Sequence, residues 1–541
     1  MKHKYLRKLI YCAAFGSVIL GGCNKDSLKN LNVNPQAAKT IDVNFLFTSA
    51  QLGAASGGSR GDNRYIDWRT NIGIASTAIQ QLSTSGGDIS STGDKYLENV
   101  ESNSAPFEFI YTDLRGLNEI ITQTGPGGFA EGQSNNTRQA ARILRAFLFH
   151  RLTDYYGSIP YSEALQAREG TFFPKYDKQK DIYKDLLKEL DEASVAFGAT
   201  DPGFSAADLY YKGDVAQWKR WGYSLMLRLA MRLSNVDVAT TNTYVAKAVA
   251  GGVFQSNADN TIVPMAEGPS LWTNQNGISR AFYPGDGGNA SFLSKTLVDF
   301  LKGPNAGATA DDDPRLMIIS GGIGTWAASG SGATFTPVPN GTDPLAQKGM
   351  PNGNDLNMLK TLEGNPNLDV NATYSKINPK LLDRAESYML MNYGEVKLLL
   401  AEAAQRGLGG LTAAAAKGHY DEGVRASMRM YVIYDPSFVV TDAQVDAYLA
   451  ARPYNAATGL AMIASQLWVN HFLNWWEAWS DWRRTRLPAF VPTNFPGNVT
   501  GGKIFERLKY PNAEVAGNPN FSNGSTTNDY VTKVWWAGGP E

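Results

Sequence analysis

Apolar positions recur at spacings of three and four along much of this chain, with charged and polar residues between them. In 138–157 this spacing places Ile143, Phe147 and Leu152 on one face, and Gly157 follows where a helix C-cap is expected. The same pattern predicts further helices over 178–198, 214–234, 386–407, 413–432 and 459–484. Gly198 and Gly407 mark the expected ends of two of them. Strand-like alternation is weak throughout, so the pattern predicts a mainly all-α fold.

Consecutive helices of this length, separated by glycine, favour packing in pairs of the tetratricopeptide type. Small residues in 401–407 and 413–427 stand where two helices would cross closely. A regular repeat consensus is not visible, so the periodicity alone supports this architecture only weakly.

Four tryptophans lie in the stretch "NWWEAWSDWRRTRLP", at 474–488. Trp475, Trp479 and Trp482 share one helical face, whereas Trp476 points away from it. We expect this face to be buried core rather than a sugar-binding surface. The two arginines that follow lie in the last turn, where cations offset the helix dipole.

Two regions lack periodicity and are rich in Gly, Asn, Pro and Ser: about 251–387, and 489–541. Long loops inside a compact domain are usually functional. We therefore expect a large, irregular, loop-rich insertion at 251–387 and an irregular C-terminal region. Isolated aromatic residues in these loops, rather than the helical ones, are the candidates for ligand contact.

The N-terminus has the pattern of an export signal. A basic segment, "MKHKYLRK", precedes a short apolar segment and the sequence Leu20-Gly21-Gly22-Cys23, which resembles a bacterial lipobox. The chain has only two cysteines, and the other, Cys12, lies within this leader. We expect 1–22 to be a lipoprotein signal peptide, Cys23 to be lipidated, 23–42 to be a tether and 43–541 to form a single domain.

Composition and motifs exclude several functions. The formal net charge of −1 gives no long-range field for nucleic acid. The sequence contains no H-E-x-x-H, G-x-S-x-G or phosphate-binding loop motif. The acidic run Asp311–Asp313 is interpreted first as a loop or helix cap. We expect no cofactor and no catalytic metal, although a structural calcium ion is possible.

Seven phrases, in this order, resemble the SusD/RagB family of outer-membrane nutrient-binding lipoproteins, and in particular its SusD-like branch. They span nearly the whole mature chain: 32–51, 141–166, 173–193, 208–235, "NYGEVKLLLAEAAQRG" at 392–407, "EAWSDWRRTRLP" at 477–488 and "FERLKYPNAE" at 505–514.

The resemblance implies four tetratricopeptide-like helix pairs and a surface-exposed, lipid-anchored protein of the outer membrane. It implies a SusC-like TonB-dependent β-barrel transporter as partner. The family's role is to capture an oligomeric nutrient, most often a glycan, and deliver it to the transporter without catalysis. We leave two alternatives open: a peptide-binding member of the same family, and an exported helical glycan-degrading enzyme. A purely structural surface protein would not account for the aromatic loops.

Sugar recognition needs flat apolar faces for the ring and polar groups for the hydroxyls. Three clusters combine these residue types: Asp62, Asn63, Tyr65, Trp68 and Arg69; Trp272, Asn274, Arg280, Phe282 and Tyr283; and Trp326 on a glycine-rich loop. The family tends to build its groove from its early helices and its insertion, so the resemblance favours the first two clusters. From the eleven residues we predict a ligand site of Trp68, Tyr65, Arg69, Trp272, Asn274, Arg280, Tyr283 and Trp326. Which oligosaccharide or peptide is bound cannot be read from the sequence.

Overall fold

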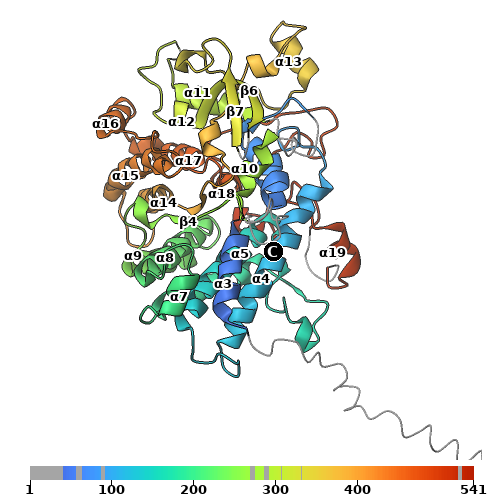
Figure 1. Cartoon of the computed structure of the whole chain (residues 1–541), viewed down its shortest axis with the longest axis vertical. Coiled ribbons are helices and arrows are strands. Elements are labelled where there is room, and N and C mark those ends of the chain that lie inside the picture. The colour runs from blue at the N-terminus through green and yellow to red at the C-terminus, as the bar shows by residue number, and fades with distance from the viewer. Residues whose placement is uncertain are drawn as a thin grey trace, which may run out of the picture. The chain divides into compact units, whose positions relative to one another are not determined.

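Helices dominate the computed structural model, as the periodicity predicts (Figure 1). The structure describes residues 41–55, 64–86, 92–268, 274–284, 291–305, 307–329, 332–521 and 527–541. The signal peptide, Cys23 and nearly all of the tether lie outside these residues. The chain from Val43 to Glu541 forms one compact unit. Among the described residues, no helix is long and apolar enough to cross a membrane.

The helices of the first half are α3 (Val43–Ala54), α4 (Val100–Gln123), α5 (Asn135–Tyr156), α6 (Gln179–Val195), α7 (Pro202–Ala207), α8 (Val215–Arg232) and α9 (Val238–Gly251). Those of the second half are α10 (Gly277–Phe282), α11 (Lys295–Lys302), α12 (Leu316–Ile319), α13 (Leu356–Leu362), α14 (Tyr393–Arg406), α15 (Ala416–Arg429), α16 (Asp442–Ala451), α17 (Gly459–Asn470), α18 (Trp475–Thr485) and α19 (Asn512–Gly517).

A π-helix, η1 (Ile66–Ser76), lies between α3 and α4. Short 3₁₀ turns are η2 (Ala167–Glu169), η3 (Asn257–Asp259), η5 (Pro344–Ala346), η6 (Val370–Ala372), η7 (Pro379–Leu381), η8 (Ala413–Ala415), η9 (Met430–Ile433), η10 (Ala456–Thr458) and η11 (Trp535–Ala537). The strands are β1 (Leu82–Ser83), β2 (Ile159–Pro160), β3 (Tyr176–Asp177), β4 (Thr261–Val263), β5 (Phe292–Leu293), β6 (Ser320–Ser329), β7 (Gly332–Pro337), β8 (Ser375–Ile377) and β9 (Tyr388–Met391).

Helices that are neighbours in the chain, or separated only by the short α7, pack against each other: α3 with α4, α4 with α5, α5 with α6, α6 with α8, α8 with α9, α14 with α15 and α17 with α18. Close crossing depends on small residues. A Cβ atom added to Gly423 on α15 would lie 2.7 Å from Leu398 Cγ on α14. One added to Gly222 on α8 would lie 2.2 Å from Ser194 Oγ on α6. Gly423, one of the small residues noted in the sequence, therefore lies where α14 and α15 meet.

Two predicted helix boundaries were wrong. The helix expected to run to Gly198 ends at Val195, and Ala196 is its C-cap. The helix expected from 386 begins at Tyr393, after the cap residue Asn392, and Tyr388–Met391 forms strand β9 instead. There β9 pairs antiparallel with β4, and this long-range pairing is not visible in the local pattern.

The insertion holds more regular structure than the sequence predicted. Strands β6 and β7 form an antiparallel hairpin, and β8 pairs with the other edge of β6. Figure 1 shows this sheet beside α11, α12 and α13. In the sequence, Thr334 and Thr336 alternate with Phe335 soon after Gly-Ser-Gly, a hairpin signal that the weak overall alternation concealed.

The helix predicted over 459–484 is in fact two helices, because the chain breaks between Asn470 and Trp475. Leu473 has a φ of 77°, in the left-handed region. The side chain of Asn71 binds both sides of this break: its Nδ2 donates to Leu473 O (3.1 Å), and its Oδ1 accepts from Trp476 N (2.9 Å). A side chain 400 residues away in sequence thus compensates the interrupted helix.

The tryptophans of α18 are core, as expected. Trp475, Trp476 and Trp479 are at most 2% exposed and Trp482 is 8% exposed. The expectation that Trp476 points away from the core was wrong, because it packs against Phe147 and under the guanidinium of Arg151 (4.9 Å to the ring centre). Helix α18 is buried on every side.

The polar residues of α18 are buried as well and form ion pairs with neighbouring helices. Arg484 binds Glu402 of α14 through both carboxylate oxygens (2.5 and 2.7 Å), and Asp481 accepts from Arg232 of α8 (3.0 Å). Arg483 donates to the carbonyls of Asp154 (2.6 Å) and Glu506 (3.0 Å). The two arginines do lie in the last turn, yet their partners come mostly from other elements.

Candidate functional site

The first predicted cluster forms one aromatic and cationic surface at the start of η1. The rings of Tyr65 and Trp68 stack at 5.9 Å with an interplanar angle of 23°. The guanidinium of Arg69 lies 4.1 Å from the centre of the Tyr65 ring, and that of Arg64 lies 5.0 Å from the same ring. Arg69 also pairs with Glu101 of α4 (2.9 Å). We call Arg64, Tyr65, Trp68 and Arg69 the aromatic–arginine cluster.

Buried polar residues fix η1 in place beneath this cluster. Asp67 is buried and accepts hydrogen bonds from Tyr388 Oη (2.9 Å) and Asn71 Nδ2 (3.0 Å). Thr70 Oγ1 donates to Ser102 O (2.8 Å), and Ser102 Oγ donates to Arg69 O (2.6 Å). π-Helical segments leave backbone groups outside the α-helical ladder and occur often at functional sites. The cluster is therefore held on a rigid support.

Helix α10 packs against η1 and carries part of the second predicted cluster. Asn276 caps its N-terminus by accepting from Ile278 N (3.0 Å) and Ser279 N (3.2 Å). At the other end, the half-buried Tyr283 stacks under the guanidinium of Arg384 (4.2 Å). Arg280 is 1% exposed, so its side chain points into the protein.

Of the other residues of the second cluster, the structure describes Asn274 but not Trp272. Asn274 lies in a turn, with a φ of 66°, and its carbonyl accepts from Ala266 N (2.6 Å). Trp272 lies outside the described residues, as do Asp62 and Asn63 of the first cluster. The structure thus brings η1 and α10 together and leaves the contribution of Trp272 as a prediction.

Trp326 lies on a strand rather than on the loop that the sequence predicted. It occupies β6 opposite Phe335 of β7, and its side chain is half-buried. Its orientation is therefore set by the β6–β7–β8 sheet.

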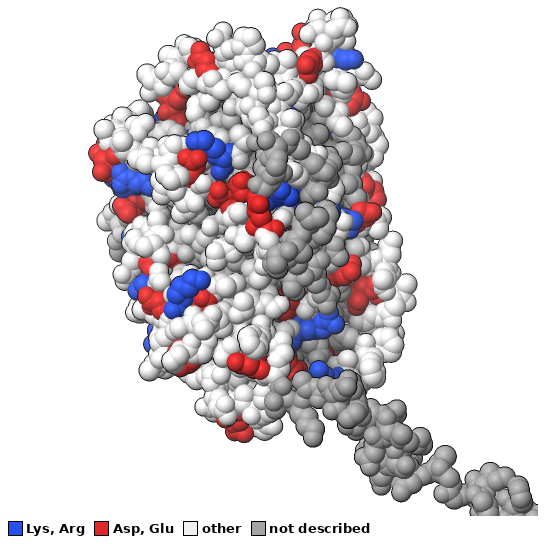
Figure 2. Space-filling view, in the orientation of Figure 1, with Lys and Arg blue, Asp and Glu red and all other residues white. Residues whose placement is uncertain are grey.

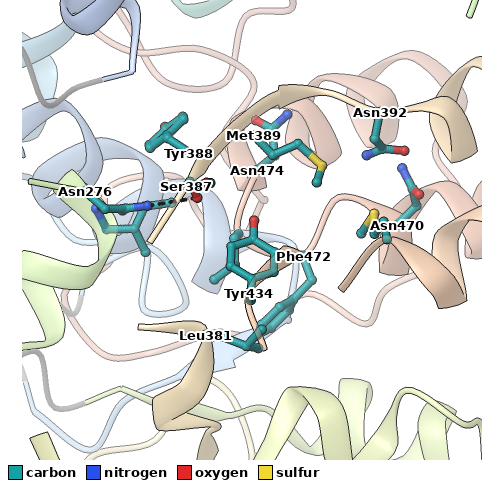
Figure 3. Close-up of a pocket in the computed structure, with 13 residues that line it drawn as sticks. Asn276, Leu381, Ser387, Tyr388, Met389, Asn392, Tyr434, Asn470, Phe472 and Asn474 are labelled. Carbon is teal, nitrogen blue, oxygen red and sulfur yellow. Dashed lines mark hydrogen bonds between the residues drawn. The ribbon is translucent and has the colours of Figure 1, made fainter. Parts of the chain in front are cut away.

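A small cavity lies behind α10, between β9 and the break that separates α17 from α18 (Figure 3). Amide side chains line it, among them Asn276, Asn392 and Asn470. Its volume of about 20 Å³ has room for about one water molecule, so a pyranose ring cannot enter. Both amide atoms of Asn470 are buried without a hydrogen-bond partner among the described residues, which fits a hydrated cavity.

One carboxyl group near this cavity has a perturbed pKa. The side chain of Glu386 is half-buried, and this partial burial raises the pKa of its carboxyl to about 7. The negative charge of Asp383 is the second cause of the rise. The backbone of the same residue is fixed, because Asn276 Nδ2 donates to Glu386 O (3.2 Å). Glu386 therefore titrates near neutral pH beside α10.

The acidic run 311–313 lies in the loop before α12, whose N-cap residue, Arg315, has no side-chain cap bond. Asp313 binds Arg315 through both oxygens (2.9 and 2.7 Å) and accepts from Arg315 N (2.9 Å) just before α12. Its carboxylate is already neutralised. A structural calcium ion stays a prediction that no observation tests.

The histidines are less isolated than their sequence spacing suggested. His471 lies with Glu395 and Glu477 in a buried group whose ligand-type atoms are within 4.8 Å of one another. However, Arg228 binds both oxygens of Glu395 (2.5 and 2.7 Å), and Arg232 pairs with Glu477. A metal ion would have to displace these cations, so we interpret the group as an ion-pair network.

Charge on the face shown in Figure 2 is mixed, with basic and acidic side chains interspersed. Among the described residues of that face there is no basic patch of the kind that binds nucleic acid.

Comparison with known proteins agrees with this architecture. Residues 35–511 match the SusD-like family described as "starch-binding associating with outer membrane". No curated protein sequence matches. Among solved structures, a chitin-binding protein is 30% identical with a TM-score of 0.75, covering 92% of this chain and 100% of its own. A SusD-like protein from Bacteroidetes is 26% identical at the same TM-score and coverage.

A chitin-binding SusD homologue from Flavobacterium johnsoniae is 21% identical, with a TM-score of 0.67, covering 92% of this chain and 98% of its own. At this identity, the likeness shows the fold alone. The family match extends over most of the chain, and the 30% identical structure covers nearly all of it. The helix pairs, the insertion and the sequence motifs thus have one explanation: the chain belongs to the SusD-like family.

Proposed function

We propose that this protein is a lipid-anchored, surface-exposed binding protein of the outer membrane that captures an oligosaccharide. It hands the oligosaccharide, chemically unchanged, to a SusC-like TonB-dependent transporter. The family description and the binding names of the similar structures support this proposal. The lipobox-like sequence before Cys23 supports the anchor. The observation that carries the binding role is the aromatic–arginine cluster on η1.

The chemistry of this cluster suits a sugar. A pyranose presents C–H groups on its faces and hydroxyls around its edge, so it is bound by an aromatic ring with polar groups beside it. Tyr65 and Trp68 supply the rings, and the partly exposed Arg69 supplies N–H donors next to them. The net charge of −1 favours a neutral glycan over a polyanion.

Binding can be tested by calorimetric titration of the full mature chain, with Cys23→Ser to keep it soluble. Chitohexaose is the first probe, because two proteins of this fold are named for chitin binding; maltohexaose is the second. We expect Trp68→Ala and Tyr65→Ala to weaken binding about tenfold each, which corresponds to about 1.4 kcal/mol.

The matched control is Trp535→Ala, a half-buried tryptophan outside the cluster, which should bind as the wild type does. Unchanged affinity in both cluster variants would contradict the site assignment. Chromatography of the sugar after long incubation tests the absence of catalysis, and shortened products would contradict it.

Delivery to the transporter needs a separate test in cells. We expect a β-barrel transporter to co-purify with the wild-type protein, and glycan uptake to fall when Cys23→Ser removes the anchor. Normal uptake by the unanchored protein would show that lipidation is not needed for delivery.

A further inference from the structure

Two phenylalanines are exposed beside a hollow that the proposed glycan site does not use. Phe172 is 71% exposed and Phe173 is 55% exposed, so two large apolar side chains that are adjacent in the sequence are both open to solvent. They line a hollow of about 400 Å³ together with Tyr111 of α4 and Ala513 and Asn518 at α19. Figure 1 shows α19 beside α4. We call this the phenylalanine hollow.

The backbone that presents these two rings is fixed. Asn520 Nδ2 donates to Phe173 O (2.6 Å), and Asn518 Nδ2 donates to Pro174 O (3.0 Å). The loop that precedes α6 is thus tied to the C-terminal region, while its two rings remain in solvent. A rigid backbone with exposed aromatic rings lowers the entropy cost of binding a partner.

The polar lining of the phenylalanine hollow is acidic. Glu108 of α4 and Glu514 of α19 line it, and no Lys, Arg or His is among its described lining residues. Glu514 Oε1 accepts from Tyr176 Oη (2.8 Å), which is a neutral partner. Lys175, the cation nearest to Phe173 in the sequence, pairs with Glu163 (3.7 Å) and Asp177 (3.8 Å).

A second hollow, of about 440 Å³, adjoins the first, because Ala164 and Leu165 line both. Asp177, Asp181 and Asp185 line this second hollow, and the one cation among its described lining residues, Arg145, pairs with Glu189 (2.9 Å). The two hollows therefore combine apolar rings with carboxylates, of which only Asp177 pairs with a cation among the described residues.

We propose that this surface docks a polypeptide segment of a partner protein in which a Lys or Arg stands next to a large apolar side chain. The apolar side chain would pack on Phe172 and Phe173, and the cation would face Glu108 and Glu514. A neutral glycan fits less well, since hydroxyls need donors as well as acceptors. The one side-chain amide among the described lining residues, Asn518, already donates to Pro174 O and Glu514 Oε1 (2.9 Å).

This surface differs from the aromatic–arginine cluster, although both adjoin α4. Phe109 faces Tyr65 (ring centres 6.3 Å apart), whereas Glu108 and Tyr111 face the phenylalanine hollow. The two proposals can therefore fail independently.

The test uses a random twelve-residue peptide display library selected against the full mature chain carrying Cys23→Ser. We expect enriched peptides to pair a Lys or Arg with a large apolar residue. Their affinity, measured by fluorescence anisotropy, should fall at least about tenfold in the Phe172→Ala/Phe173→Ala variant. It should also fall with Glu108→Gln and with rising salt.

The matched control is Leu362→Ala/Val491→Ala, which removes two apolar side chains that are 61% and 80% exposed elsewhere. This control should bind the peptides normally, and all variants should keep the wild-type circular dichroism and glycan affinity. The proposal is overturned if no peptide is enriched, if enriched peptides lack basic residues, or if the Phe172→Ala/Phe173→Ala variant binds them normally. Loss of chitohexaose binding in that variant would also overturn it, by making the hollow a sugar subsite.

Discussion

Replacing Arg484 by methionine tests how far the buried ion pairs of α18 stabilise the fold. The Arg484 side chain is fully buried, and its partners Glu402 and Asp481 are 3% and 9% exposed. Removing one member of a buried pair leaves an uncompensated charge in a medium of low dielectric constant, which costs about 3–5 kcal/mol. Methionine keeps much of the side-chain volume, so cavity formation adds little.

The expected loss lies at the lower end of this range, at about 3 kcal/mol. Glu402 keeps its contact with Arg406 (2.9 Å), and Asp481 keeps Arg232 (3.0 Å). An unfolding entropy of about 2.1 cal/mol/K per residue, over about 500 residues, converts 3 kcal/mol into a fall in Tm of about 3 °C.

Arg425→Met is the matched control, because Arg425 also binds two carboxylates, Asp442 (2.8 Å) and Asp446 (2.6 Å). That arginine is 26% exposed and its partners are 75% and 64% exposed. Pairs in water contribute about 0–1 kcal/mol. Urea unfolding, followed by tryptophan fluorescence and by circular dichroism, measures both losses. Equal losses in the two variants would refute the reasoning that burial makes the difference.

Other predictions concern helix crossing, pH dependence and the hairpin. Gly423→Ala should destabilise the protein, because the new Cβ would lie 2.7 Å from Leu398 Cγ. Gly418→Ala on the same helix places its Cβ where no atom lies within 4 Å, so it should stabilise the protein by about 0.5–1 kcal/mol. Thermal unfolding of both variants tests this pair of predictions. Since the pKa of Glu386 is raised from 4.5 to about 7, its stabilising contribution is complete below pH 4.5 and is lost as the pH rises through 7. Glu386→Gln should therefore increase the unfolding free energy relative to wild type at about pH 8 and leave it unchanged at about pH 4. If the variant and the wild type differ in unfolding free energy by the same amount at both pH values, the raised pKa of Glu386 is contradicted. Pro substitution at Thr325, which pairs with Thr336 within the β6–β7 hairpin, should destabilise the sheet, and limited proteolysis near 320–337 measures this.

Local periodicity predicted the elements whose stability comes from an amphipathic face. Helices α5, α8, α14 and α15 and the buried tryptophans of α18 belong to this class. The break between α17 and α18 could not be predicted, because it depends on Asn71. Strand β9 likewise depends on β4, more than 120 residues earlier. The tertiary partner outweighs local propensity in both cases.

The candidate site likewise contains contacts that the sequence could predict and contacts that it could not. Tyr65, Trp68 and Arg69 are close in sequence, so one short motif was enough to predict that they cluster. Arg384 was missed, although it stacks on Tyr283, because about 100 residues separate them and nothing in the local pattern links them. The exposure of Phe172 and Phe173 was missed for a related reason: composition does not show which aromatic residues the fold leaves uncovered.

The π-helical form of η1 also bears on how specificity could change in this family. Its hydrogen bonds span one residue more than those of an α-helix. Deleting Thr70, which lies between Trp68 and Asn71, would favour an ordinary α-helix, and each residue there turns the chain by about 100°. With Asn71 held by the chain break before α18, Tyr65 and Trp68 would then point in a new direction. A one-residue insertion or deletion at this point would thus re-aim the ring surface without replacing Tyr65 or Trp68.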